Sequence, residues 1–320
     1  MRLAIRQFPI ILTVLFFYFS QAHAHHPAAI IGPGAGGPIR TFSAQTLPKG
    51  KADFSFHVEY FDFDSFSDGE LRAFALGGSD VHSTESVLHL SLMAGYGLTE
   101  DLTLGLKLPY ARVEGVKEAH ADEPDDVHRH GDSSGIGDLT LFGQYRFLNA
   151  KDYQGSFLLG LKTPSGETTV RDIENERFET EFQPGSGSWD PSVGMAFQKS
   201  FGKLTLYTSF LYKFVTEGAQ DVNLGDAFHY NAAAAYSLPT GDFSCDLIFE
   251  INGESRKKQE LSGLKDPNSG GNLILLSPGV RLGWKRLSAT VSAGFPVLQE
   301  LNGIQNEMNY TLLTSLSFAF

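Results

Sequence analysis

The chain ends in Tyr310–Phe320, YTLLTSLSFAF, and this stretch decides the fold class. Alternate residues place Tyr, Leu, Thr, Leu, Phe and Phe on one face and Thr, Leu, Ser, Ser and Ala on the other. Alternation at a period of two is typical of a β-strand with one apolar face. An aromatic residue that closes such a strand at the C-terminus is also what assembly into a bacterial outer membrane requires, so we expect the assembly machinery to bind the strand that ends at Phe320.

The same alternation recurs along the chain, with almost no helical spacing. Eleven further stretches show it: Ala52–Asp62, Val87–Gly97, Leu102–Arg112, Asp138–Phe147, Ser156–Thr163, Asp190–Gln198, Leu204–Phe214, Phe228–Ser237, Phe243–Asn252, Leu273–Trp284 and Leu287–Val297. Most are close to the roughly 9 to 11 residues that a tilted strand needs to cross hydrocarbon. We therefore predict an all-β fold, a transmembrane antiparallel up-and-down β-barrel of about 12 strands, with 14 as the alternative.

The connections alternate in length, which a soluble sandwich does not require. Short turns, such as Leu98–Asp101 and Lys285–Arg286, follow every second strand. Long polar loops are predicted at Asp64–Ser86, Val113–Gly137, Pro164–Trp189, Val215–Ala227, Gly253–Asn272 and Leu298–Asn309. Tight periplasmic turns and longer outer loops are typical of outer-membrane barrels.

The two faces of the predicted strands differ in charge. One face is apolar and is expected to contact lipid. The other is expected to line the pore with His57, Glu59, His89, Lys107, Asp138, Arg146, Lys162, Asp190, Lys213, His229, Asp246, Glu250 and Arg281, together with Asp53. These charges either set the selectivity of a water-filled lumen or neutralise one another in a narrow barrel. Acids and bases nearly balance, which favours neutral solutes or mutual pairing over strong ion selectivity.

A leader precedes the strands. Arg2 and Arg6, the largely apolar run Phe8–Phe19 and the small-x-small site Ala22–Ala24 predict a secretory signal peptide at residues 1–24. Its removal would change the formal net charge from −12 to −14, because two basic residues and no acidic ones would be lost. We expect a flexible Gly/Pro-rich segment at 25–50, either a partial plug of the lumen or a periplasmic tail, and the barrel at 51–320.

Composition excludes several classes of protein. With 19% charged and 12% aromatic residues, the chain is too apolar to be disordered. The negative charge argues against nucleic acid as a partner. Cys245 is the only cysteine, so no intramolecular disulfide forms. The GxGxxG at Gly32–Gly37 follows a leader rather than a strand, which removes the dinucleotide interpretation, and no cofactor is expected.

Two further features of the sequence could carry chemistry, and each has a simpler interpretation. The loop His120–His130, HADEPDDVHRH, concentrates imidazoles and carboxylates, and His120, His128 and His130 are candidate metal ligands, although acidic loops are usually only solvated. A protease site at the outer rim would use Asp62, Asp64, Asp68 and His82, but nothing in the sequence fixes their geometry. No Ser and His stand together on the lipid face, as a lipase would need. We therefore expect the protein not to be an enzyme.

Three stretches carry a resemblance to a known family. They are Gly32–Ile39 (GPGAGGPI) running to Leu47–Lys51, Gly135–Phe142 (GIGDLTLF) through Tyr145–Phe147, and Gln183–Gly194 (QPGSGSWDPSVG). Together they resemble the outer-membrane transporter family named after the meta-pathway of phenol degradation. The resemblance implies a channel or transporter in the outer membrane of a Gram-negative bacterium and offers no catalytic residue.

The sequence thus predicts a barrel in the lipid bilayer whose lumen passes a small solute, with aromatic or hydrophobic molecules favoured by the resemblance. Two alternatives stay open. One is a metal-binding surface protein that uses the His- and acid-rich loop, and the other is a sealed barrel with a structural role.

Overall fold

A computed structural model describes residues 37–241 and 243–320, so the predicted signal peptide and residues 25–36 lie outside the described residues. Twelve antiparallel strands form a closed barrel. They are β1 (Ala52–Phe63), β3 (Ser86–Thr99), β4 (Leu102–Ala119), β6 (Thr140–Asn149), β7 (Tyr153–Lys162), β8 (Asp190–Phe201), β9 (Leu204–Lys213), β11 (Ala227–Thr240), β12 (Phe243–Arg256), β15 (Gly271–Trp284), β16 (Leu287–Leu301) and β17 (Met308–Ala319). Each strand pairs with its neighbour along the chain, and β17 pairs with β1, which closes the sheet. The predicted twelve strands are confirmed.

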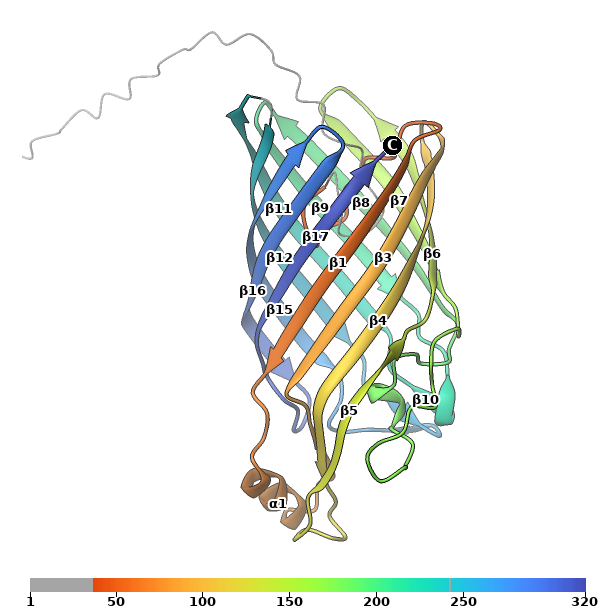
Figure 1. Ribbon diagram of the computed structural model, residues 1–320, viewed down its shortest axis with the longest axis vertical. Coiled ribbons are helices and arrows are strands. Elements are labelled where there is room, and N and C mark those ends of the chain that lie inside the picture. Colours follow the sequence, from red (N-terminus) through yellow and green to blue (C-terminus); the bar gives the residue numbers. More distant parts are fainter. Residues whose placement is uncertain (1–36, 242) are drawn as a thin grey trace, which may run out of the picture.

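The connections also follow the predicted asymmetry. Figure 1 shows the C-terminus at one end of the barrel and α1 (Asp68–Leu76) beyond the opposite end. The long loops carry the remaining elements: β2 (Val81–Ser83), β5 (His128–Ile136), η1 (Thr180–Phe182), η2 (Ala219–Asp221), β10 (Val222–Asn223), β13 (Glu260–Leu261) and β14 (Leu264–Lys265). Within the described residues, no helix is both long enough and apolar enough to cross a bilayer.

The prediction of one long loop was wrong. Residues 113–137 were expected to form a polar loop, but β4 continues to Ala119 and β5 pairs back onto it as a hairpin beyond the barrel wall. The register of β4 against β5 shifts between Val113 and Val116 and again beside Lys117, so the period-two pattern fails there. Because β2 and β5 both join β4, the full sheet has 14 strands while the closed wall has 12.

The exterior of the barrel is apolar, as the alternation predicts. The exposed large side chains include those of the predicted lipid face, among them Phe54, Phe56, Leu92, Leu104, Leu106, Leu141, Phe157, Leu159, Val193, Leu247, Phe249, Leu282 and Val291. Most of the buried side chains in the strands are polar, with many Ser and Thr. This arrangement inverts that of a soluble protein and is typical of a barrel immersed in lipid.

Aromatic side chains gather near the ends of the strands. Tyr96, Tyr145, Tyr236 and Trp284 are exposed close to the short turns, and Tyr110 is exposed towards the loop end of its strand. Phe320 lies edge-on to Phe54 and to Phe318, and its backbone N–H donates to the carbonyl of Ala52 at 2.8 Å. Interfacial aromatic belts of this kind fix the depth of a barrel in the bilayer.

Leu92 tests the lipid-facing assignment, because it lies near the middle of β3 and is 58% exposed. We expect Leu92→Arg to reduce assembly strongly, since an arginine on the lipid face at the bilayer midplane costs roughly 2–4 kcal/mol. Leu76→Arg is the control, because Leu76 ends the loop helix α1 and is also exposed. The measurement is the fraction of folded, heat-modifiable protein in outer-membrane preparations. Equal yields of the two variants would show that the face of β3 carrying Leu92 does not contact lipid.

Candidate functional sites in the lumen and at the outer mouth

The lumen near the loop end is organised around Asp190 and Asp138. The buried carboxylate of Asp190 lies 3.1 Å from Lys162 Nζ and 3.2 Å from Lys213 Nζ. Asp138 lies just before β6, rather than within a strand as predicted. It accepts from Lys162 Nζ at 2.7 Å and from the backbone N–H groups of Gly166 and Ser186 at 2.9 Å each. The two acids therefore balance two lysines and anchor the loop between β7 and β8.

The other predicted pore residues are spread along the barrel. His57 Nε2 lies 2.8 Å from Ser55 Oγ, Arg146 pairs with Asp101 at the turn between β3 and β4, and His229 Nδ1 lies 3.4 Å from Glu254. Asp246 accepts a hydrogen bond from Ser237 at 2.6 Å and lies 4.0 Å from Arg281. Glu59 forms an ion pair with Arg40. The ring of His89 lies edge-on to that of Phe61. Lys107 forms no hydrogen bond or ion pair with another described residue. Charge in the lumen is thus mostly paired.

The segment before the first strand lies inside the barrel. Ile39, Ala44 and Leu47 are buried, and the fully buried carboxylate of Glu250 on β12 accepts from three successive backbone N–H groups, those of residues 39–41, at 2.8 to 3.0 Å. Further along, the side chain of Gln198 accepts from Ser43 Oγ at 2.7 Å, and Thr103 accepts from the N–H of Leu47 at 2.8 Å. Polar groups of three different strands therefore replace water as partners of this backbone.

A cavity of about 260 Å³ lies beside that segment. Its apolar lining includes Phe42 from the segment together with Met93, Phe142, Leu158 and Leu211 from the barrel wall. Its polar lining includes Lys107, Lys162, Asp190 and Lys213. The cavity therefore combines an aromatic and aliphatic wall with a few charged groups, as small-molecule sites commonly do.

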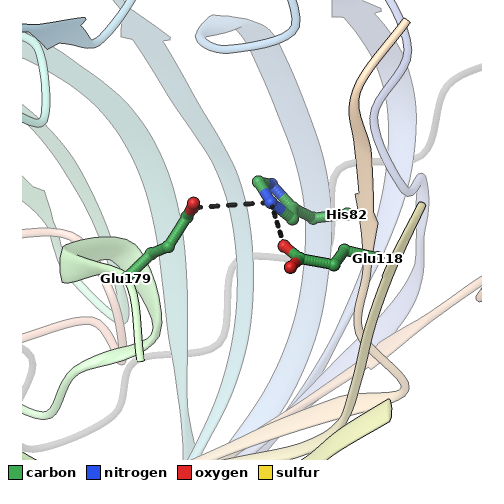
Figure 2. A group of neighbouring side chains, drawn as sticks. All are labelled: His82, Glu118 and Glu179. Carbon is green, nitrogen blue, oxygen red and sulfur yellow. Dashed lines mark ion pairs between the residues drawn. The ribbon is translucent and has the colours of Figure 1, made fainter. Parts of the chain in front are cut away.

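A second group of titratable side chains lies at the loop end of the barrel, which we call the outer mouth. Two carboxylates approach one histidine there (Figure 2). His82 Nε2 is 2.8 Å from Glu118 Oε2 and 3.4 Å from Glu179 Oε2. On the other side of the ring, His82 Nδ1 is 3.4 Å from Glu181 Oε1. The backbone fixes part of this arrangement, because His82 on β2 stands directly opposite Glu118 on β4 in the sheet.

Two of the three histidines predicted as ligands join this group. His120 Nε2 and His130 Nε2 lie 2.8 Å and 2.9 Å from the other carboxylate oxygen of Glu118, Oε1. His130 also contacts Asp172 through Nδ1 at 2.6 Å. His128 does not reach Glu118, and its Nε2 comes no closer than 3.9 Å to Glu123. The sequence alone did not indicate Glu118, Glu179 or Glu181, although Glu118-x-His120 and Glu179-x-Glu181 each place two residues of ligand type two positions apart.

Electrostatics favours positive charge in this cluster. Burial lowers the pKa of His82, but hydrogen bonds with Glu118 and Glu181 and the charges of Glu181 and Glu179 outweigh it, so the pKa lies well above its ordinary value. The pKa of His130 is also raised, because contacts with Asp172 and Glu118 exceed the effect of its burial. The carboxylates thus create a strongly negative site that stabilises a cation.

A profile of the family described as "Putative MetA-pathway of phenol degradation" matches residues 35–300. The chain belongs to this family. The match spans most of the barrel and also includes the segment that lies in the lumen. The profile of the phenol degradation family therefore covers both parts of the fold. The resemblance expected from the Gly- and Pro-rich strand boundaries is confirmed.

Solved structures with a similar barrel fold are also found. The barrel of this phenol degradation family member is similar to the COG4313 outer membrane channel from Pseudomonas putida F1, with a TM-score of 0.59 and 16% identity over 86% of this chain and 97% of that one. The KdgM porin aligns with a TM-score of 0.44 and 9% identity, over 84% of this chain and 99% of that one. No curated protein matches the sequence. The apolar exterior of the closed barrel is that of a β-barrel in the outer membrane of a Gram-negative bacterium.

Proposed function

We propose that the protein is an outer-membrane channel for small, predominantly apolar solutes, aromatic molecules included. The observation that carries this proposal is the lumen cavity, whose wall combines Phe42, Phe142 and Leu158 with a small number of charged groups. An aromatic solute would pack against these side chains by dispersion and apolar burial. The phenol degradation family name points to the same class of molecule.

The pairing of charges in the lumen supports passage of neutral solutes. Asp190 is held between Lys162 and Lys213, and Glu59 pairs with Arg40 of the inserted segment. Paired charges create a weaker field than a ring of one sign, so they impose little selection on ions. We propose that the segment at 37–50 acts as a partial plug and that solutes pass beside it or when it shifts.

Conductance and uptake test the proposal together. Purified protein in a planar bilayer is expected to give small, resolvable current steps. Relative to protein-free liposomes, proteoliposomes should show a larger increase in swelling rate in benzyl alcohol than in a sugar of similar osmolarity. A barrel that conducts no ions and admits none of these solutes would instead be the sealed structural barrel. Faster entry of sugars than of aromatic alcohols would reject the proposed solute class.

Lys107 provides a prediction on selectivity, because it lines the cavity without an ion-pair partner among the described residues. Lys107→Glu is expected to raise the cation-to-anion permeability ratio about fivefold. That ratio corresponds to roughly 1 kcal/mol, the interaction of unit charges about 4 Å apart in water. The measurement is the reversal potential in a salt gradient, and Lys107→Met should give about half the shift. Identical reversal potentials for both variants and the unmodified protein would show that ions do not pass this residue.

A further inference from the structure

The outer mouth carries a group of side chains that passage of a solute does not explain. Three carboxylates, Glu118, Glu179 and Glu181, surround the ring of His82. With His82 neutral, as a metal ligand must be, the three carboxylates carry a net charge of −3 when they are ionised. A divalent cation that takes the place of the His82 proton would neutralise most of that charge.

The distances fit a small metal ion. One ligand atom each from His82, Glu118 and Glu179 lie within 4.8 Å of one another. Zinc binds nitrogen and oxygen at about 2.0–2.2 Å, so tetrahedral ligand atoms stand about 3.3 Å apart. His82 Nε2 and Glu179 Oε2 already have this spacing at 3.4 Å, whereas Glu118 at 2.8 Å must withdraw by about half an ångström. Such a shift exchanges a hydrogen bond for a metal bond without moving the backbone.

The surroundings orient these ligands as metal sites require. A histidine ligand usually donates its second ring N–H to a carboxylate, which fixes its tautomer and orientation. Glu181 occupies that position, 3.4 Å from His82 Nδ1, and is itself held by Gln259 at 2.8 Å. The ring of Phe182 lies edge-on to the imidazole with the ring centres 5.4 Å apart. The orientation of His82 is therefore set before any ion arrives.

Glu118 is supported in a similar way. Its second oxygen, Oε1, faces His120 and His130, and Asp172 contacts the far nitrogen of the His130 ring. The first oxygen, Oε2, points to His82 and is available to an ion at that position. His120 and His130 therefore act as positioning residues for Glu118, and His128 has no part in the site.

Solvent reaches the site through a cavity at the loop end of the barrel. His82, Glu179 and Glu181 line a cavity of about 540 Å³ at the loop end of the barrel, bounded also by Asn268 and Asn306. This cavity provides an entry path for an ion and room for a water molecule as the fourth ligand. Imidazole with carboxylates suits first-row transition metals better than Ca²⁺ or Mg²⁺, which prefer oxygen alone.

We propose that His82, Glu118 and Glu179 bind Zn²⁺ or a similar first-row transition-metal ion. The bound ion would connect the β2–β4 pair to the loop between β7 and β8 across the outer mouth. The ligands come from three separate parts of the chain, so a bound ion would cross-link them. This site does not depend on the channel proposal, and either can fail without the other.

The test is a zinc titration of the full-length mature protein in detergent, without a purification tag and with His25→Ala and His26→Ala so that the N-terminus does not contribute. Isothermal titration calorimetry is expected to show one Zn²⁺ per chain. His82→Ala and Glu118→Gln should each weaken binding by tenfold or more, because even changes beyond the direct ligands typically cost about 10–100-fold. His128→Ala is the matched control and should bind as the parent does.

A second readout separates metal binding from loss of folding. Zn²⁺ should protect the loop at residues 163–189 from proteolysis in the parent and in His128→Ala, but not in His82→Ala, while all three remain heat-modifiable barrels. Unchanged zinc affinity in His82→Ala would overturn the proposal. So would loss of binding in His128→Ala alone, which would assign the metal to the loop sequence instead, or Ca²⁺ binding as tightly as Zn²⁺.

Discussion

A chain that begins at Leu47 after the signal peptide, without residues 25–46, is expected to conduct ions several-fold better than the unmodified protein. The segment fills part of the lumen, with Ile39 and Ala44 buried inside the barrel. The wall does not depend on it, because the strand ladders run continuously from β1 round to β17. Single-channel recording of the truncated barrel gives the measurement. Unchanged conductance would show that residues 37–46 do not limit passage.

A single substitution should reproduce part of this effect. The Glu250 carboxylate accepts from the N–H groups of residues 39–41, and Glu250→Ala would leave them without that partner. A buried donor left unsatisfied costs about 1–3 kcal/mol, so the segment should leave its position more often and produce frequent transitions to a larger conductance. Thr290→Ala is the control, because Thr290 bonds Ser315 and has no hydrogen bond to residues 37–50. Equal transition frequencies in the two variants would contradict the anchoring role of Glu250.

The barrel wall could be predicted from the sequence because lipid imposes a simple rule. Each strand must present apolar residues to hydrocarbon at every second position, as β17 does, so alternation alone identified all twelve strands to within a few residues at most ends. Beyond the membrane this rule no longer applies. The outer end of β4 buries Val113, Val116 and Ala119 three residues apart, which hides its pairing with β5. Helix α1 does have a local signal in the sequence, the capping box of Ser67 and Glu70.

The candidate sites depend on contacts that no local pattern contains. His82, Glu118 and Glu179 stand in separate stretches, and only the β2–β4 pairing and the loop fold bring them together. The composition of the His120–His130 loop gave His128 the same weight as His120, although of these two only His120 lies within hydrogen-bond distance of Glu118. The partner of the inserted segment, Glu250, is about two hundred residues away in the sequence. The alternation could predict which side chains leave the apolar face, whereas it could not predict how they pair with one another.

Asp190→Asn is expected to make the channel clearly anion-selective. Asp190 is only 2% exposed, and its carboxylate lies between Lys162 and Lys213 on the wall of the lumen cavity. The amide keeps an oxygen for the N–H of Thr216, 3.2 Å away, but removes one negative charge. Three lysines would then be the only charged residues that line the cavity. We expect the anion-to-cation permeability ratio to rise about tenfold, equivalent to roughly 1.4 kcal/mol.

The double variant Asp190→Asn/Lys213→Met makes this prediction specific to charge. Removing Lys213 as well restores the original balance of charge in the cavity, so the reversal potential should return towards that of the unmodified protein. A purely structural effect of losing the buried carboxylate would instead persist, because Lys162 would still lack the partner it has at 3.1 Å. Lys213→Met alone should shift selectivity towards cations. If the single and double variants have the same reversal potential, the ions that cross the barrel do not sense Lys213, and the proposed path beside the cavity is wrong.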